Sequence, residues 1–316
     1  NVKRLGITAA CCALLLIVFL ALKAYQSTSM KAVAASKQIS LSHNLTMRES
    51  VDFESQIKEA RALRTGNSEG QRHPKNIKKS RKLLESMLKK AKIYSAYQRW
   101  RILDQLCEVE FADRRWLDAR NYATESLDSV LSPKFMSGSV PTSLCHARSL
   151  RDIARADLHL EHYTAAIKRV DEFNKLLTNA QFSGREQDMI KAEMLSLEAT
   201  CYLKLAQFKK SIAVSKKALA FNEKIEGGPH DKQAALLYEA RTLNGLMEGY
   251  LKFNALESAE HTKTKLLTLI QAEYGKGINK DEAGVLLRAI NNVWASNGKA
   301  REAYAVNESF KKFLKT

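Results

Sequence analysis

A pattern of helical hairpins that recurs along the chain limits the possible folds more than any other feature of this sequence. Equivalent leucines of five successive units are separated by 47, 45, 48 and 44 residues. They are Leu103, Leu150, Leu195, Leu243 and Leu287. From residue 94 onward apolar residues also recur at helical spacing, so each unit has an apolar face that a neighbouring unit must cover. We therefore expect units stacked in a row, a fold in which the length of 316 residues says little about domain number.

Small side chains mark where the two helices of each unit approach each other. In the second helix this place holds Ala119, Ala166, Ser211, Ala259 and Ala303. In the first helix, where the column is less regular, it holds Cys107, Ala154, Ala199, Met247 and Asn291. The second helices open at Trp116, Tyr163, Phe208, Leu256 and Ala300, of which all but the last are bulky. Small residues let neighbouring helices pack closely, so the columns predict antiparallel helix pairs.

The third of these units resembles a tetratricopeptide repeat. Leu195, Glu198, Ala199 and Tyr202 stand where that pattern has a large residue, a leucine, a small residue and a tyrosine. The resemblance implies an all-α fold, a right-handed superhelical solenoid of antiparallel helix pairs. It also implies that the first helix of each pair lines a concave groove that grips a peptide or helix of a partner.

A loop in the fourth unit resembles the kinesin light chain class of these repeats. That class ends a leucine-rich second helix in a Gly-x-x-His-Pro-like loop, which residues 227–230 (GGPH) approximate with Pro and His in inverted order. A similar junction follows at residues 273–283, without the proline. The resemblance covers residues 94–316, which we expect to form about five repeats. Upstream, residues 51–93 fit a basic helical half-repeat.

Composition agrees with a helical fold. The chain has only 4 Pro and 13 Gly, and its abundant Ala, Leu, Lys and Glu favour long helices over strands. The 5 cysteines lack CxxC spacing, and we expect Cys107 and Cys201 to pack as small apolar residues and not to form a disulfide framework.

An apolar segment near the start predicts a transmembrane helix. Residues 5–22 carry no charge, and a helix of that length reaches roughly 27 Å, enough to cross a bilayer. The alternative is a secretory signal that is cleaved, since Lys3 and Arg4 give a basic start. Basic residues lie on both sides of the segment, and we favour an extracytoplasmic C-terminal domain. Residues 23–50 read as a spacer or as a helical extension of the anchor.

Catalytic motifs are missing from the sequence. It has no GxGxxG, GxxxxGK[ST], GxSxG or HExxH pattern. His159 and His162 are three residues apart, which is the wrong spacing for a zinc helix, and Glu108 and Glu110 point to different faces. We expect a protein that is not an enzyme and that has no catalytic residues, metal or cofactor.

Polar residues on the expected groove face are the candidate binding residues for a protein partner. The first helix of the second unit carries a ladder of arginines at i, i+3 and i+7, which suits carboxylates. The candidate residues are Arg148, Arg151, Arg155, Thr200, Arg241, Asn244, Arg288 and Asn292. The alternative is that Arg148 pairs with Asp152 and that the other arginines are solvated.

A second basic region precedes the first full unit. Its members are Lys78, Lys79, Arg81, Lys82, Lys89 and Lys90. Together with the formal charge of +17, they predict contact with an anionic membrane surface or an acidic partner. Nucleic acid is the competing ligand, because Tyr94, Tyr97 and Trp100 interleave with basic residues there. Our interpretation is a membrane-tethered scaffold for a protein partner, ahead of a nucleic-acid-binding protein and of an enzyme without a recognisable motif.

Overall fold

A computed structural model describes residues 51–65, 74–90, 94–136, 140–179, 185–223, 225, 229–274, 278 and 280–313. The expected transmembrane helix at residues 5–22 and the spacer at 23–50 lie outside the described residues. Within the described ranges no helix is long and apolar enough to cross a membrane. The chain divides into two compact units, residues 1–59 and 60–316, and every helix from residue 74 onward belongs to the second unit.

The described secondary structure is helical apart from one isolated bridge between Tyr274 and Ile278. A helix spans residues 51–65. The others are α2 (Pro74–Lys89), α3 (Ala96–Ala112), α4 (Trp116–Leu131), α5 (Thr142–His159), α6 (Tyr163–Asn179), α7 (Arg185–Lys204), α8 (Phe208–Asn222), α9 (Pro229–Lys252), α10 (Leu256–Glu273), α11 (Lys280–Ser296) and α12 (Ala300–Phe313). The second helices α4, α6, α8, α10 and α12 begin at the residues that the sequence pattern assigned to them.

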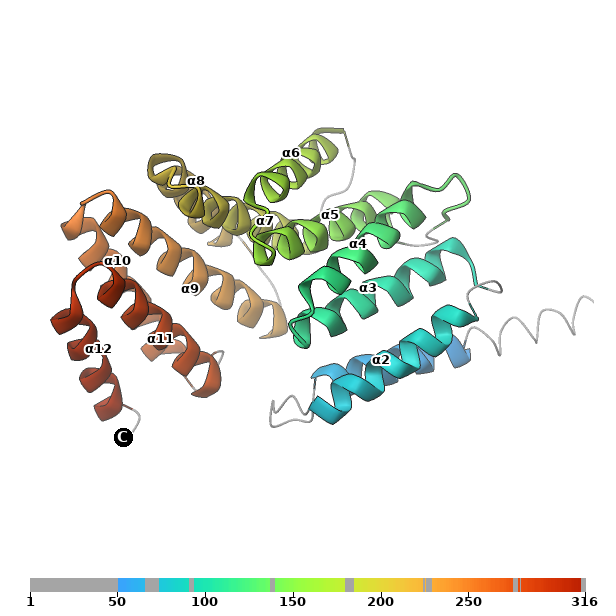
Figure 1. The fold of residues 1–316 in the computed structure, drawn as a ribbon, viewed down its shortest axis with the longest axis horizontal. Helices are drawn as coiled ribbons and strands as arrows, with labels where there is room; N and C mark the ends of the chain where they lie inside the picture. Colours follow the sequence, from blue (N-terminus) through green and yellow to red (C-terminus); the bar gives the residue numbers. More distant parts are fainter. Residues whose placement is uncertain are drawn as a thin grey trace, which may run out of the picture. The chain divides into compact units, whose positions relative to one another are not determined.

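Successive helices form antiparallel pairs, which confirms the expected all-α solenoid (Figure 1). Within the second unit α3 packs on α4, α5 on α6, α7 on α8, α9 on α10 and α11 on α12. The first helices also pack on one another, since α5 contacts α7, α7 contacts α9, and α9 contacts α11. The first helices therefore form one layer and the second helices another.

The turn inside each pair repeats with the same geometry. In every pair one residue has a left-handed backbone, with φ between 57° and 76°. These residues are Arg114, Glu161, Ala206, Asn254 and Gly298, each eleven positions after the leucine that marks its unit. The amide after each of them donates to a carbonyl five residues earlier at 2.8–2.9 Å, which is a Schellman motif. Five identical helix ends confirm that the units share one register.

Small residues fill the helix contacts that the pattern assigned to them. Ala119, Ala166, Ser211, Ala259 and Ala303 are all buried. The Ser211 hydroxyl donates to the carbonyl of Ala199 at 2.8 Å, so its polar atom is satisfied at the contact. The column of the first helices is also buried in the first four units, whereas Asn291 in the last is half-buried.

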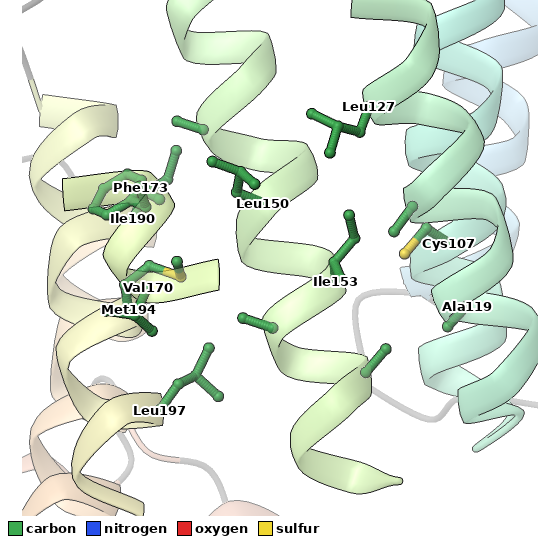
Figure 2. Close-up of a cluster of buried hydrophobic side chains, with 14 of the residues drawn as sticks. Cys107, Ala119, Leu127, Leu150, Ile153, Val170, Phe173, Ile190, Met194 and Leu197 are labelled. Atoms are coloured by element: carbon green, nitrogen blue, oxygen red, sulfur yellow. The ribbon is translucent and has the colours of Figure 1, made fainter. Parts of the chain in front are cut away.

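Apolar side chains from successive pairs pack into core clusters that each span several helices. Figure 2 shows Leu150 and Ile153 of α5 between Leu127 of α4 and the α6–α7 side chains Phe173 and Met194. A second cluster joins α9 to α12. Cys107, Cys145 and Cys201 are free and buried, and burial raises the pKa of each thiol. They remain protonated packing residues, as expected for Cys107 and Cys201.

Candidate functional site

A pocket opens where α5, α7 and α9 lie side by side in the layer of first helices. Its volume is about 260 Å³. The lining residues are Arg155, Leu158, His159, Glu193, Ser196, Leu197, Thr200, Tyr238 and Arg241. Three of the candidate binding residues, Arg155, Thr200 and Arg241, meet there. Most of its walls carry charges, hydroxyls or an imidazole, so the pocket suits a polar group of a ligand.

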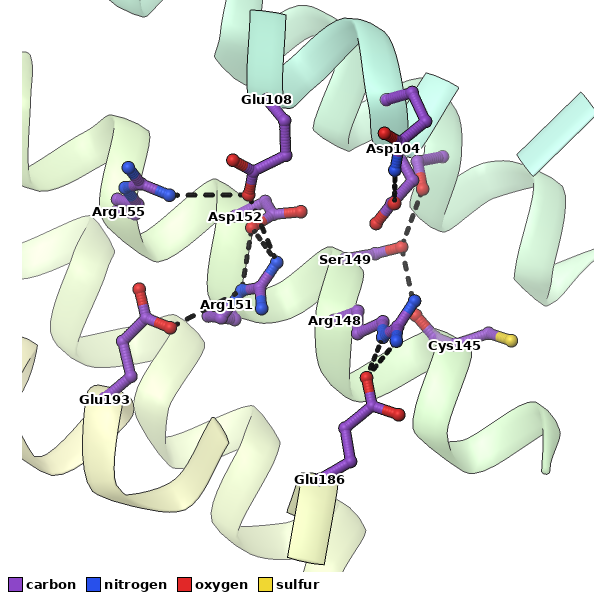
Figure 3. Close-up of polar contacts among 12 residues, drawn as sticks. Asp104, Glu108, Cys145, Arg148, Ser149, Arg151, Asp152, Arg155, Glu186 and Glu193 are labelled. Atoms are coloured by element: carbon purple, nitrogen blue, oxygen red, sulfur yellow. Dashed lines mark hydrogen bonds and ion pairs between the residues drawn. The ribbon is translucent and has the colours of Figure 1, made fainter. Parts of the chain in front are cut away.

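The arginine ladder of α5 is held by carboxylates of the neighbouring helices (Figure 3). Arg148 pairs with Glu186 of α7. Arg151 lies 2.7 Å from Asp152 and reaches Glu108 of α3 and Glu193 of α7 at 3.6 and 3.8 Å. The side chain of Arg151 is only 17% exposed. The ladder therefore ties α3, α5 and α7 together.

Arg155 is the rung that borders the pocket. Its guanidinium lies 3.4 Å from Glu108 and 4.0 Å from the centre of the Phe111 ring. Stacking on an aromatic ring and pairing with a carboxylate use the planar shape of arginine. The alternative pairing of Arg148 with Asp152 does not occur, since Asp152 binds Arg151.

Asp152 is a carboxyl of this network whose pKa is raised. It is 2% exposed, and this burial raises its pKa to about 7. The charge of Arg151 lowers this pKa, whereas Glu108 and Asp104 raise it. Burial in a contact between helices is thus the main reason that the Asp152 pKa lies above its ordinary value.

The other wall of the pocket comes from α7 and α9. The Tyr238 hydroxyl donates to Glu193 at 2.9 Å, and burial is the main cause that raises the Tyr238 pKa. His159 stacks on Trp116 with ring centres 4.0 Å apart. Burial and the nearby charges of Arg155 and Arg241 lower the pKa of His159, which favours neutral imidazole. Arg241 is exposed at the rim.

The remaining candidate residues lie away from the pocket. Asn244 on α9 is half-buried, and its Oδ1 is buried without a hydrogen-bond donor in the structure. Arg288 and Asn292 on α11 are exposed. The structure therefore does not gather all eight residues into one site. Tyr238 was missed because it precedes the fourth unit's leucine by five residues and matched no column.

The basic region upstream splits into two kinds of residue. Lys78, Lys79, Lys82, Lys89 and Lys90 are exposed. Arg81 pairs with Glu110 at 2.7 Å and with Asp113, at the end of α3. Arg81 therefore fastens α2 to α3, and the five lysines form the outward basic surface. The described residues contain no group of three metal-ligating side chains.

Comparison with solved structures finds the same fold in repeat proteins. A kinesin light chain with nearly identical TPR-like repeats from Podosopora anserina shares 12% identity at a TM-score of 0.50, over 70% of this chain and 95% of that one. BtubC (BKLC) from P. vanneervenii shares 12% at 0.53, over 82% and 90%. The apo form of RapI shares 12% at 0.52, over 76% and 93%. No family model and no curated protein matches the sequence. The chain is a tetratricopeptide-repeat-like protein by fold.

Proposed function

We propose that this protein is a non-enzymatic scaffold that holds a segment of a partner protein in the pocket formed by α5, α7 and α9. The observation that carries the proposal is the polar pocket between three first helices of a repeat fold that generally serves protein–protein interaction. A partner segment that enters the pocket loses water from its polar groups. The polar side chains of the lining can replace that water as hydrogen-bonding partners.

Arg241 and Thr200 are the residues best placed to contact the partner. Arg241 is exposed at the rim, and none of the ion pairs described in the structure involves it. Thr200 and Ser196 of α7 add hydroxyls to the lining of the same pocket. An acidic side chain or terminal carboxylate of the partner is the group that a free guanidinium binds most strongly. The charges of the three α5 arginines are already matched by carboxylates of the chain. We therefore assign these arginines to positioning α5 beside the pocket and not to binding the partner.

The proposal includes attachment to a membrane through residues 5–22, with the repeats on the extracytoplasmic side. The five exposed lysines of the α2 region would then lie near the bilayer surface, where anionic lipids attract them. The support is the uncharged run of the sequence and the exposure of these lysines.

Site-specific photocrosslinking in intact cells tests the pocket. A photoreactive residue in place of Arg241 should capture a defined protein, and the same residue in place of exposed Lys175 on α6 should not. The purified partner should then lose at least about tenfold in affinity for Arg241→Glu, since a charge-assisted contact becomes a repulsion. Capture of the same proteins from both positions, or unchanged affinity of Arg241→Glu, would exclude the pocket as the binding site.

A further inference from the structure

The second helix of the third pair, α8, differs from all other second helices in its charge. Its sequence FKKSIAVSKKALAFN contains four lysines and no acidic residue. The helices α4, α6, α10 and α12 each contain at least two acidic residues. In the flanking helices α6 and α10, Arg169 pairs with Glu172 and Lys263 with Glu260 of the same helix. α8 therefore presents a charge that its own sequence does not neutralise.

The four lysines lie in two rows on the exposed side of α8. Lys209 and Lys216 form one row and Lys210 and Lys217 the other, and all four are exposed. Seven residues separate the members of a row, which corresponds to about 10.5 Å along the helix. Between the rows stand the exposed residues Ala213 and Ala220, which repeat with the same spacing. This arrangement, called here the α8 lysine face, consists of these six residues.

Aromatic rings beneath the lysines hold three of the ammonium groups in place. Lys209 lies 5.6 Å from the centre of the Phe253 ring. Lys210 and Lys216 lie 5.3 and 5.8 Å from the rings of Tyr202 and Tyr250. Tyr202 belongs to α7 and Tyr250 to α9, the helices on which α8 packs (Figure 1), and Phe253 directly follows α9. A cation held over a ring loses less freedom on binding an anion than a free lysine does.

The described part of the chain supplies no carboxylate that forms an ion pair with these four lysines. Glu198 of α7 interacts electrostatically with the face, since the charge of Lys217 lowers the Glu198 pKa. Burial and Asp171 nevertheless leave the Glu198 pKa raised overall. The α8 lysine face is thus an exposed, ordered and positively charged surface.

We propose that the α8 lysine face docks an acidic α-helix of a protein partner, at a site separate from the pocket. A facing helix with carboxylates in two rows at seven-residue spacing matches the two lysine rows, in the way that flanking charges match in coiled coils. The alanines between the rows let the two helix axes approach closely. The lysine rows and the line of alanines between them thus repeat with the same period of seven residues.

Two other anionic ligands fit this face less well. A lipid bilayer takes up large apolar side chains beside basic ones, and the line of alanines offers only Ala213 and Ala220. Single-stranded nucleic acid stacks bases on open aromatic rings, whereas an ammonium group lies over each of the rings of Phe253, Tyr202 and Tyr250.

The test uses the full chain in detergent and a labelled helical peptide with glutamates in two rows around alanines at seven-residue spacing. A second peptide has the same composition with the glutamates scattered around the helix. Fluorescence anisotropy should show that the matched peptide binds at least about tenfold more tightly than the scattered one. A photoreactive residue in place of Ala213 should crosslink to the matched peptide. Equal affinity of the two peptides overturns the proposal.

A matched pair of variants separates the face from general attraction to a basic protein. One variant changes Lys209, Lys210, Lys216 and Lys217 to Gln, and the control changes Lys78, Lys79, Lys82 and Lys89 to Gln. The first should lose at least about tenfold in affinity for the matched peptide and the control less than about twofold. Equal losses, or a loss confined to phosphatidylserine vesicles or single-stranded RNA as ligand, contradict the proposal. Arg241→Glu should leave peptide affinity unchanged, so failure of this site and failure of the pocket are distinguishable.

Discussion

The α5 arginines and the α8 lysines are both rows of basic residues on a helix of a repeat, but their surroundings differ completely. Arg148, Arg151 and Arg155 are partly buried and reach carboxylates of α3, α5 and α7. The four lysines of the α8 lysine face are exposed and lie over aromatic rings or in solvent. Planar guanidinium groups suit shared contacts between helices, and compact ammonium groups remain hydrated. Positive charge is therefore structural in the α5 ladder and available for partners on α8.

Among single substitutions, the largest loss of stability should follow removal of the central arginine. Arg151→Ala leaves Asp152, Glu108 and Glu193 with one fewer cation in a buried contact, which should lower the free energy of unfolding by about 3 kcal/mol. Urea unfolding followed by circular dichroism measures this loss. Lys216→Ala is the control and should change the free energy by less than about 0.5 kcal/mol. Similar losses for the two variants would contradict the distinction between structural arginines on α5 and exposed lysines on α8.

The pH dependence of stability should reveal the buried acid of the ladder. The Asp152 pKa is raised to about 7 in the fold from an ordinary value of 3.8. Between these values the folded state binds more protons than the unfolded state, so stability should fall as the pH rises from about 4 to 7. Asp152 can contribute at most about 4 kcal/mol to this fall, at about 1.4 kcal/mol per pKa unit.

Asp152→Asn should remove most of that slope, which urea unfolding at a series of pH values would show. Replacement of an exposed acid, as in Glu223→Gln, serves as the control and should leave the slope in place. A slope of equal size in Asp152→Asn would mean that another group titrates in the network.

A smaller effect should distinguish arginine from lysine at the same charge. Arg155→Lys removes the planar guanidinium that stacks on Phe111 and pairs with Glu108. The substitution should lower the free energy of unfolding by about 1 kcal/mol. The reverse exchange on α8, Lys216→Arg, should be neutral within about 0.5 kcal/mol. Thermal unfolding of both variants checks the pair, and equal costs would contradict a special role of the guanidinium.

The smallest effect on stability should come from the α8 lysine face as a whole. Changing its four lysines to Gln should alter the free energy of unfolding by less than about 0.5 kcal/mol in total, because the side chains are exposed. The difference should shrink further in high salt. Urea unfolding at two salt concentrations measures it, and a large loss would place these lysines among the structural residues.

The fold could be predicted from the sequence because apolar residues recur at helical spacing and because the same pattern is repeated in five units. The expected openings of the second helices, such as Tyr163 and Phe208, are the first residues of α6 and α8. The left-handed turns were not predicted, because four of the five hold Arg, Glu, Ala or Asn in place of glycine. Tertiary packing overrides the local preference of those residues.

The site could be predicted only in part, because its partners lie in other repeats. Arg155 pairs with Glu108, 47 residues earlier, and Tyr238 with Glu193, 45 residues earlier. The first distance equals the spacing of the first two units, so a comparison of equivalent positions would have indicated that Glu108 faces Arg155. The second distance is three residues shorter than the spacing of 48 between the third and fourth units, so Glu193 and Tyr238 are not equivalent positions. The α8 lysine face was overlooked because its lysines match no motif, and their exposure became evident only in the structure.

The five identical turns have a consequence for how the chain can change in length. In every pair the left-handed residue stands eleven positions after the marker leucine and the small residue of the second helix sixteen, so each hairpin is constant. The spacings of 47, 45, 48 and 44 then differ only because the stretches from one hairpin to the next differ. The protein is therefore a series of helical hairpins of constant length joined by connecting segments of variable length. We therefore expect insertions and deletions to be tolerated between hairpins, whereas a single residue added within a hairpin should rotate its second helix out of register with the other second helices.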